Sequence, residues 1–147
     1  MQILLIDDNP ADAELTRQCF RESRIPNEVH CVMDGERALA FLRREGTFGQ
    51  SPRPDLVLLD LNMPGIDGRE ILAAIKTDPE LLAIPVVILT TSDADSDVSE
   101  AYRLHANSYL RKPVDLDEFF ELADAVCTYW FHYVKLPSAG RTSLSTR

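Results

Sequence analysis

The feature that most constrains the fold is a series of short apolar runs that recur along the chain every 22 to 29 residues or so. The clearest are Ile3–Ile6, Leu56–Leu59 and Pro85–Leu89, and weaker ones lie at 27–32 and 107–110. Between them lie segments with the apolar spacing of an amphipathic helix. Strands that are apolar on both faces and alternate with helices form a parallel sheet covered on both sides. The pattern therefore predicts an α/β fold, a doubly wound five-stranded parallel sheet of the flavodoxin type with strand order 2-1-3-4-5.

Length and composition are those of one domain. A chain of 147 residues that is 45% hydrophobic and 27% charged can bury a core without disulfides or metals. We expect the folded domain to occupy residues 1–134, including an extended C-terminal helix. The segment 135–147 contains no acidic residue and no apolar period. We expect it to be a flexible tail, with no output domain.

Charge and cysteine content exclude several classes of function. The 24 acidic residues outnumber the 15 basic ones, so nucleic-acid binding is not expected. The three cysteines are widely spaced and form no C-x-x-C motif, which argues against a disulfide framework or a zinc site and favours a reducing compartment. The first residues do not resemble a signal peptide, and no apolar run approaches the ~18 residues of a membrane span. We expect a cytoplasmic protein that does not bind membranes.

Reactive side chains follow four of the expected strands. Asp7 and Asp8 come after the first, Asp60 after the third, Thr90 at the end of the fourth and Lys112 after the fifth. Open α/β sheets bind ligands beyond the carboxyl ends of their strands, at the point where the strand order reverses. The sequence therefore predicts one crevice that holds three carboxylates, a hydroxyl and an ammonium group.

These residue types favour a metal-assisted phosphoryl site. Three neighbouring carboxylates require a cation, and oxygen ligands without His or Cys favour Mg²⁺. The first turn lacks the glycine fingerprint of a dinucleotide site, and its acids would repel a pyrophosphate. Asp60 is the expected nucleophile, because a carboxylate can form an aspartyl-phosphate. Lys112 and the Thr90 hydroxyl are expected to bind the phosphoryl oxygens.

Four stretches around these residues carry a family resemblance: LLIDDNPAD, DLVLLDLNMPGIDG, VVILTTS and ANSYLRKPV. Over about residues 1–127 the chain resembles the receiver domain of bacterial two-component response regulators. The resemblance implies that Asp60 accepts a phosphoryl group from the phosphohistidine of a sensor histidine kinase. Asp7 and Asp8 match the acidic pair of the family. The backbone carbonyl of Asn62 is implied as the third protein ligand of Mg²⁺, beside Asp8 and Asp60.

The same resemblance implies roles for the residues at the other two strand ends. Thr90 matches the switch hydroxyl, and Tyr109 matches the aromatic residue that turns inward when the threonine moves toward the phosphate. Lys112 matches the family's lysine, and Pro113 is expected to follow a cis peptide bond. His105 and Arg111 stand where smaller or neutral residues are expected, and the sequence offers no account of either.

The resemblance narrows at two further stretches, FLRREGTFGQSPRPDLVLLDLNMPGIDGREIL and YWFHYVKLP. They are similar to single-domain regulators that are paired with bacterial phytochrome histidine kinases. This implies a stand-alone regulator that signals through protein contacts downstream of such a kinase. A chemotaxis-type regulator that binds a motor is the alternative.

An aspartyl-phosphate phosphatase of the haloacid-dehalogenase kind is an alternative of another class. Such an enzyme needs Asp-x-Asp at its nucleophile, and the second acid protonates the leaving group. Here Asp60 is followed by Leu61 and Asn62. We therefore expect no enzyme activity beyond the chain's own phosphotransfer and dephosphorylation. A phosphate-independent scaffold would require the loss of a site residue, and none is lost.

Two further clusters remain, one of acidic residues and one of aromatic residues. Asp93, Asp95 and Asp97 imitate a calcium loop but lack its Gly and Glu, so we expect them to stabilise the start of the fourth helix. The final helix carries six of the eleven aromatic residues. One apolar stripe on it is expected to cover the sheet: Leu116, Phe119, Ala123, Val126 and Trp130. A second stripe is expected to form a homodimer interface, with packing under the tail as the alternative: Leu122, Ala125, Tyr129, His132 and Leu136.

Overall fold

The computed structural model describes residues 1–63, 65 and 67–137, and in this part of the chain five strands form one parallel sheet. The strands are β1 (Gln2–Ile6), β2 (Glu28–Val32), β3 (Leu56–Leu59), β4 (Val86–Thr90) and β5 (Ser108–Arg111). Their order is β2-β1-β3-β4-β5, and every neighbouring pair is parallel. The predicted fold class and strand order are confirmed.

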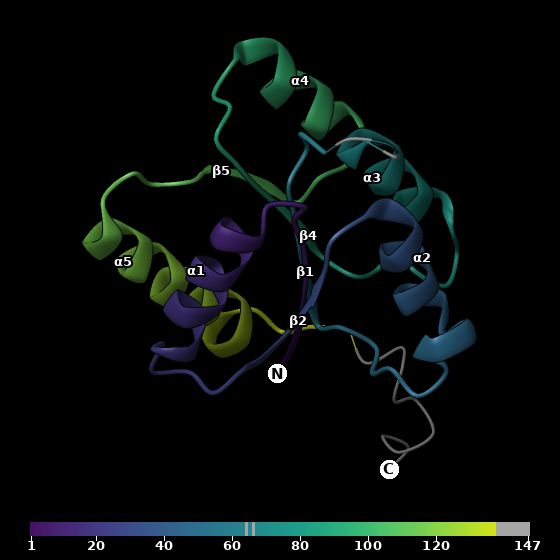
Figure 1. The fold of residues 1–147 in the computed structure, drawn as a ribbon, viewed down its shortest axis with the longest axis horizontal. Helices are drawn as coiled ribbons and strands as arrows, with labels where there is room; N and C mark the ends of the chain where they lie inside the picture. Colours follow the sequence, from purple (N-terminus) through teal and green to yellow (C-terminus); the bar gives the residue numbers. More distant parts are fainter. Residues whose placement is uncertain (64, 66, 138–147) are drawn as a thin grey trace.

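Helices cover both faces of the sheet. They are α1 (Pro10–Arg21), α2 (Gly35–Arg43), α3 (Gly68–Thr77), α4 (Asp95–Arg103) and α5 (Leu116–Cys127). A short 3₁₀ helix, η1 (Gly46–Phe48), follows α2, and a π-helix, η2 (Thr128–Tyr133), continues α5. Helices α1 and α5 lie on one side of the sheet, and α2, α3 and α4 lie on the other (Figure 1). None of the helices in the described ranges is long and apolar enough to cross a membrane.

Short polar residues after the strands fix where the helices begin. Asn9 caps α1 by accepting from the backbone N–H of Asp12, and Asp34 caps α2 in the same way. Asp67 and Glu70 form a reciprocal capping box at the start of α3. Side-chain caps thus fix the first turns of α1, α2 and α3, whereas Ala94 at the start of α4 provides no such cap.

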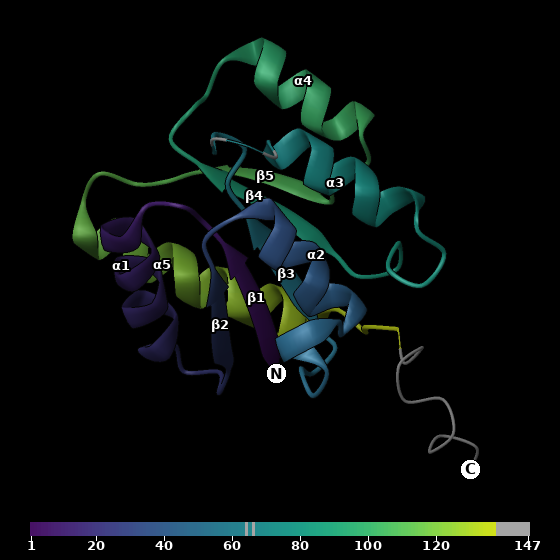
Figure 2. The same ribbon diagram turned by 45° about the vertical axis from the view of Figure 1, so that its right-hand side comes forward.

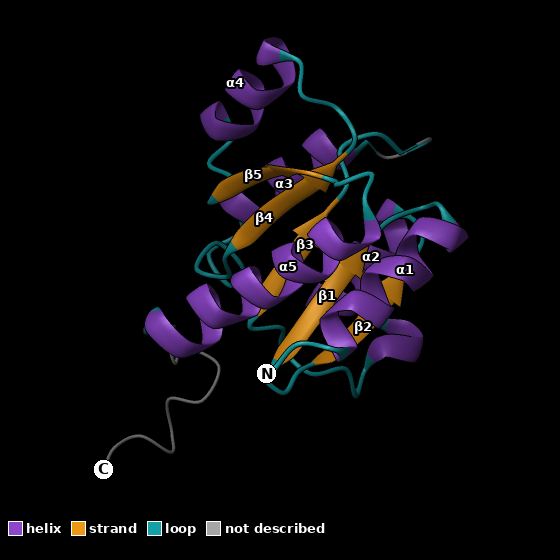
Figure 3. Ribbon diagram, turned by 90° about the vertical axis from the view of Figure 1, so that its left-hand side faces the viewer, coloured by secondary structure: helices purple, strands orange, loops and turns teal. Residues whose placement is uncertain are grey.

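The core consists of two apolar clusters, one on each face of the sheet. Along β1, Leu4 and Ile6 belong to the cluster beneath α2 and α3, while Ile3 and Leu5 belong to the cluster beneath α1 and α5. Figure 2 shows β1 in the middle of the sheet, and Figure 3 shows α5 lying against one face of the sheet. Because both faces are covered, a central strand has no polar side, which explains the continuous apolar runs.

The C-terminal helix is less regular than expected. Phe119, Ala123 and Val126 are buried, as the first stripe predicts, and Trp130 packs partly against the same cluster. The prediction for Leu116 is wrong, because its side chain is 50% exposed. It follows the N-cap directly, before the helix reaches the apolar cluster. The predicted flexible tail lies mostly outside the described residues, which end at position 137.

Candidate functional site

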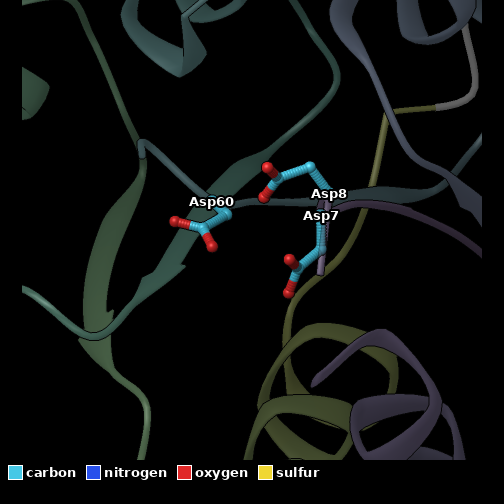
Figure 4. A group of neighbouring side chains, drawn as sticks. All are labelled: Asp7, Asp8 and Asp60. Carbon is cyan, nitrogen blue, oxygen red and sulfur yellow. The ribbon is translucent and has the colours of Figure 1, made fainter. Parts of the chain in front are cut away.

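Three carboxylates meet at the carboxyl ends of β1 and β3. One oxygen from each of Asp7, Asp8 and Asp60 lies within 4.8 Å of the others, and the side chains gather around a common space (Figure 4). Asp7 and Asp60 are buried, and Asp8 is half-buried. Little water is available to separate these charges, so the cluster favours a bound cation.

Lys112 follows β5 and reaches across to the same cluster. Its Nζ atom donates to Asp7 Oδ2 at 2.7 Å and to Asp60 Oδ2 at 3.2 Å, and the side chain is almost fully buried. A third carboxylate, Asp12 in the first turn of α1, lies 3.4 Å from the same nitrogen. Sequence reasoning missed Asp12, although its position in the helix turn after Asp7 and Asp8 was a usable signal.

Burial and charge act against each other in this cluster. Burial raises the pKa of Asp7, although hydrogen bonds from Lys112 and the Asn9 backbone work in the lowering direction. Burial alone lowers the pKa of Lys112, but its hydrogen bond to Asp7 and the charges of Asp60, Asp7 and Asp12 leave it raised. The lysine is therefore held as an ammonium group. One such charge does not balance the surrounding carboxylates.

Thr90 and Asn62 connect the cluster to β4. Thr90 is the last residue of β4 and is fully buried, and its Oγ1 accepts from Asn62 Nδ2 at 3.2 Å. The backbone N–H of Asn62 donates to Asp60 Oδ1 at 3.1 Å. The Thr90 carbonyl accepts from the backbone N–H of Lys112 at 2.7 Å. The expected ammonium of Lys112 thus contacts Asp60 directly, and the expected hydroxyl of Thr90 is linked to Asp60 through Asn62.

Tyr109 lies on β5 and faces the loop between β4 and α4. Its hydroxyl donates to the carbonyl of Ser92 at 2.9 Å, and its ring packs partly against the apolar cluster beneath α2 and α3. The backbone N–H of Tyr109 donates to the hydroxyl of Tyr102 on α4 at 3.2 Å. Tyr109 therefore joins β5 to both ends of the segment that includes α4.

A second polar network, here called the Arg69 clasp, joins α3 to α4. Arg69 donates from Nε to Glu100 at 2.5 Å and from Nη2 to Asp97 at 2.6 Å, and it also pairs with Asp67. Asp97 accepts from the Ser92 hydroxyl at 2.5 Å. The bond from Ser92, together with Arg69, lowers the pKa of Asp97. Asp97 lies in the first turn of α4, as expected, but its partner Arg69 was missed by sequence reasoning.

Gly68, another residue missed from the sequence, is the first residue of α3. A Cβ atom at this position would lie 2.4 Å from the carbonyl oxygen of Asp60 and 2.6 Å from the Cα of Leu61. Only glycine therefore allows α3 to start so close to the chain that carries Asp60.

The structure corrects the expectation at Pro113 and explains two unusual residues. The bond before Pro113 is trans, since the described residues contain no cis peptide bond. The trans form is intrinsically favoured by about 0.5–1 kcal/mol before proline.

His105 adopts the left-handed conformation (φ 73°) just after α4, and its N–H donates to the Tyr102 carbonyl. Arg111 pairs with Asp93 at 3.2 Å, and Asp93 lies just before α4, whose first turn contains Asp95 and Asp97.

Comparison with known proteins agrees with this geometry. Residues 3–124 match the family model of the response regulator receiver domain. Response regulator Rcp1 from Synechocystis sp. is 45% identical over 137 residues, which is 93% of each chain.

Solved structures with the same fold include two regulators of this kind. The Mn(2+)-bound form of response regulator Rcp1 has a TM-score of 0.84 at 45% identity, over 92% of this chain and 98% of that one. The phosphorylated cyanobacterial phytochrome response regulator RcpA has a TM-score of 0.87 at 44% identity, over 93% and 98%. The chain belongs to the family of response regulator receiver domains, and a phytochrome response regulator is among its homologues.

Proposed function

We propose that this chain is a stand-alone response regulator that accepts a phosphoryl group from a sensor histidine kinase onto Asp60. The observation that carries the proposal is the position of Asp60, buried at a strand end with the Lys112 ammonium at 3.2 Å and two further carboxylates beside it. The proposal takes residues 1–134 as the receiver domain. Residues 135–147 stay a predicted tail.

The acidic cluster is suited to a divalent metal ion, which we propose is Mg²⁺. The Asp8 and Asp60 carboxylates and the backbone carbonyl of Asn62 would hold it, with Asp7 at the edge of the site. All are oxygen donors, which hard ions prefer, and a homologue has been solved with Mn²⁺ bound. When bound, the ion would neutralise charge on the incoming phosphoryl group.

The chain's own residues then have distinct tasks in the transfer. A carboxylate oxygen of Asp60 attacks the phosphorus, the new O–P bond forms, and the P–N bond of the phosphohistidine breaks with its electron pair returning to the imidazole. Lys112, already held as an ammonium group, binds one phosphoryl oxygen. The Thr90 hydroxyl donates to another. The Thr90 oxygen accepts from Asn62, which leaves the hydroxyl hydrogen free to be donated to the phosphate.

Thr90 and Tyr109 are proposed to carry the change from the site to the surface. A shift of Thr90 alters the end of β4 and the loop that follows it, where the Ser92 carbonyl accepts from Tyr109. Release of that bond frees the Tyr109 ring to turn inward. The face formed by α4 and β5 then has two arrangements, which a partner protein can distinguish.

Labelling with a small phosphoryl donor such as acetyl phosphate tests the acceptor. In the presence of Mg²⁺ the wild-type chain gains the mass of one phosphoryl group, and Asp60→Asn does not. Asp93→Asn, an exposed acid that pairs with Arg111, is the matched control and retains labelling. Removal of divalent ions with EDTA abolishes it. Equal labelling of Asp60→Asn and wild type would refute the proposal.

The kinase is proposed to be of the phytochrome type, because the phosphorylated homologue is a cyanobacterial phytochrome response regulator. Transfer from a purified phosphorylated bacteriophytochrome kinase is expected to be much faster than transfer from a chemotaxis kinase. The reverse order would favour the motor-binding alternative.

The three cysteines are free, which suits the reducing cytoplasm where we propose the chain acts. The chain is proposed to catalyse only its own phosphotransfer and dephosphorylation.

The second stripe of the C-terminal helix is proposed to pair two copies of the chain. Tyr129 is 56% exposed, and Ala125 and His132 are exposed beside it. Leu122 packs partly against the core, and Leu136 lines a separate groove of about 320 Å³, so they are expected at the margin of the interface. Sedimentation should show a dimer that Tyr129→Arg converts to a monomer. The control Tyr102→Arg, on α4, leaves the dimer intact, and a wild-type monomer at tens of micromolar would refute the pairing.

A further inference from the structure

The two edge strands of the sheet differ in how their outward backbone groups are used. On β5, the outward N–H of Tyr109 donates to the hydroxyl of Tyr102. On β2, the N–H of Glu28 and the carbonyl of Val32 bond to the β1 side, so the alternate residues Val29 and Cys31 direct their backbone groups away from the sheet. Within the described ranges, no side-chain hydrogen bond reaches those groups. β2 is therefore the open edge.

A groove of about 510 Å³ runs beside this open edge. Arg17 and Arg21 of α1 line it on one side, and Phe41 of α2 and Phe48 of η1 line it on the other. The Phe41 ring packs against both Phe48 and His30, with ring centroids 5.5 Å apart in each pair. Figure 2 shows β2 at the margin of the sheet between α1 and α2. Phe41 and Phe48 thus give the groove an aromatic wall.

The charge of the groove is opposite to that of the whole protein. The chain carries a net charge of −9, but the groove is lined by two arginines against one acid, Glu28. In the part of the chain that the structure describes, neither Arg17 nor Arg21 forms an ion pair with a carboxylate, whereas Arg24 and Arg69 do. Arg17 also contacts the Cys31 side chain, but neither guanidinium group has its charge balanced by a carboxylate, and such groups beside an open strand favour a ligand that brings carboxylates.

We propose that the open edge of β2 binds an extended acidic segment of a partner protein, which adds a sixth strand to the sheet. Backbone bonds to Val29 and Cys31 supply the affinity of such strand addition, and side-chain contacts supply its specificity. Arg17 and Arg21 select acidic side chains on one face of the added strand. The phosphoryl site takes no part, so this binding is independent of the proposed function.

A blocked hexapeptide of alternating Val and Glu is the probe. With the wild-type chain, the amides of Val29 and Cys31 are expected to gain protection from hydrogen exchange. The double variant Arg17→Glu, Arg21→Glu is expected to bind the peptide about tenfold or more weakly. Arg103→Glu, a charge reversal at an exposed position on α4, is the matched control and leaves the affinity unchanged. Asp60→Asn, which abolishes phosphoryl acceptance, is also expected to bind normally.

Two altered peptides separate strand addition from general charge attraction. A Val-Lys hexapeptide is expected not to bind. A Val-Glu peptide with alternate backbone amides methylated keeps its charges but loses its donors, and it is also expected not to bind. Binding of the methylated peptide with the affinity of the parent, or protection that falls outside β2, would overturn the proposal. These peptide controls need no substitution in the protein, so they decide the matter even if the double variant folds poorly.

Discussion

Helices α4 and α5 are attached to the sheet by different kinds of contact. Four residues of α5 are buried in the core, namely Phe119, Ala123, Val126 and Cys127, whereas α4 buries only Ala101. Helix α4 is held instead by the Arg69 clasp and by the bond between Tyr102 and Tyr109. A buried apolar side chain fits one position in a close-packed core, so moving it costs free energy. Charged and hydroxyl groups, in contrast, can exchange one hydrogen-bond partner for another. The helix expected to respond to phosphorylation is thus the one with exchangeable contacts.

The largest loss of stability is expected from a substitution in the buried face of α5. Phe119→Ala removes a side chain that is 3% exposed, and it should lower the free energy of unfolding by about 3–5 kcal/mol. Urea denaturation measures this loss. Leu116→Ala, one turn earlier on the same helix and half exposed, should cost less than about 1 kcal/mol. Similar losses for both variants would mean that α5 is not held by its buried face.

The next largest loss of stability is expected at the start of α3, which positions the segment that carries Asp60. Gly68→Ala places a Cβ atom against backbone atoms of Asp60 and Leu61. It should destabilise the fold by about 1–3 kcal/mol and slow labelling by acetyl phosphate. The control Gly49→Ala meets only one atom, at 3.6 Å, and has an ordinary φ of −58°. If both variants label at the wild-type rate, α3 does not position Asp60.

A smaller loss of stability is expected when the Arg69 clasp is broken. Arg69→Gln removes the charge that joins α3 to α4, at a cost of about 1 kcal/mol because the network is partly exposed. Hydrogen exchange should then accelerate in α4 and not in α5. Arg24→Gln breaks an ion pair of comparable length with Asp124 on α5. If that variant releases α5 as readily as Arg69→Gln releases α4, the two helices are not attached differently.

Lowering the pH should weaken the Arg69 clasp. The hydroxyl of Ser92 and the Arg69 charge hold the pKa of Asp97 below its usual value in the folded chain. A lowered pKa stabilises the fold above the unfolded value, and that contribution is lost as the pH falls below about 4. Exchange in α4 should therefore rise in this range in wild type and less in Asp97→Asn. An equal rise in both would assign the acid effect to other groups.

The smallest effect should be a gain in stability at the end of α4. His105→Gly relieves the left-handed conformation at φ 73°, and the gain should be about 0.5 kcal/mol after the larger chain entropy of glycine is subtracted. Thermal unfolding measures the change. Arg44→Gly, at φ 56° after α2, offers the same test on a helix that does not belong to the clasp. A loss of stability at position 105 would show that the imidazole makes a contact worth more than the strain.

Most of the sheet and of the acidic site could be predicted because the signals are local. An apolar run marks each central strand, and the parallel topology then brings Asp7, Asp8 and Asp60 to one edge. The Arg69 clasp could not be predicted, because it joins residues about 30 positions apart through the packing of two helices. The cis bond expected before Pro113 rested on the family resemblance, because no local pattern in the sequence distinguishes the two forms of a proline bond. The π-turns of η2 likewise leave no mark in the apolar pattern.

The strand order also has a consequence for how the chain folds. The central strand β1 has neighbours on both sides, and Ile3 pairs with Leu56 in β3. The middle of the sheet therefore closes only after more than a third of the chain is available, whereas β4 and β5 join nearest neighbours in sequence. Such non-local pairing slows folding. Until β3 arrives, the apolar first strand has one open side, so folding intermediates should be most prone to aggregation there.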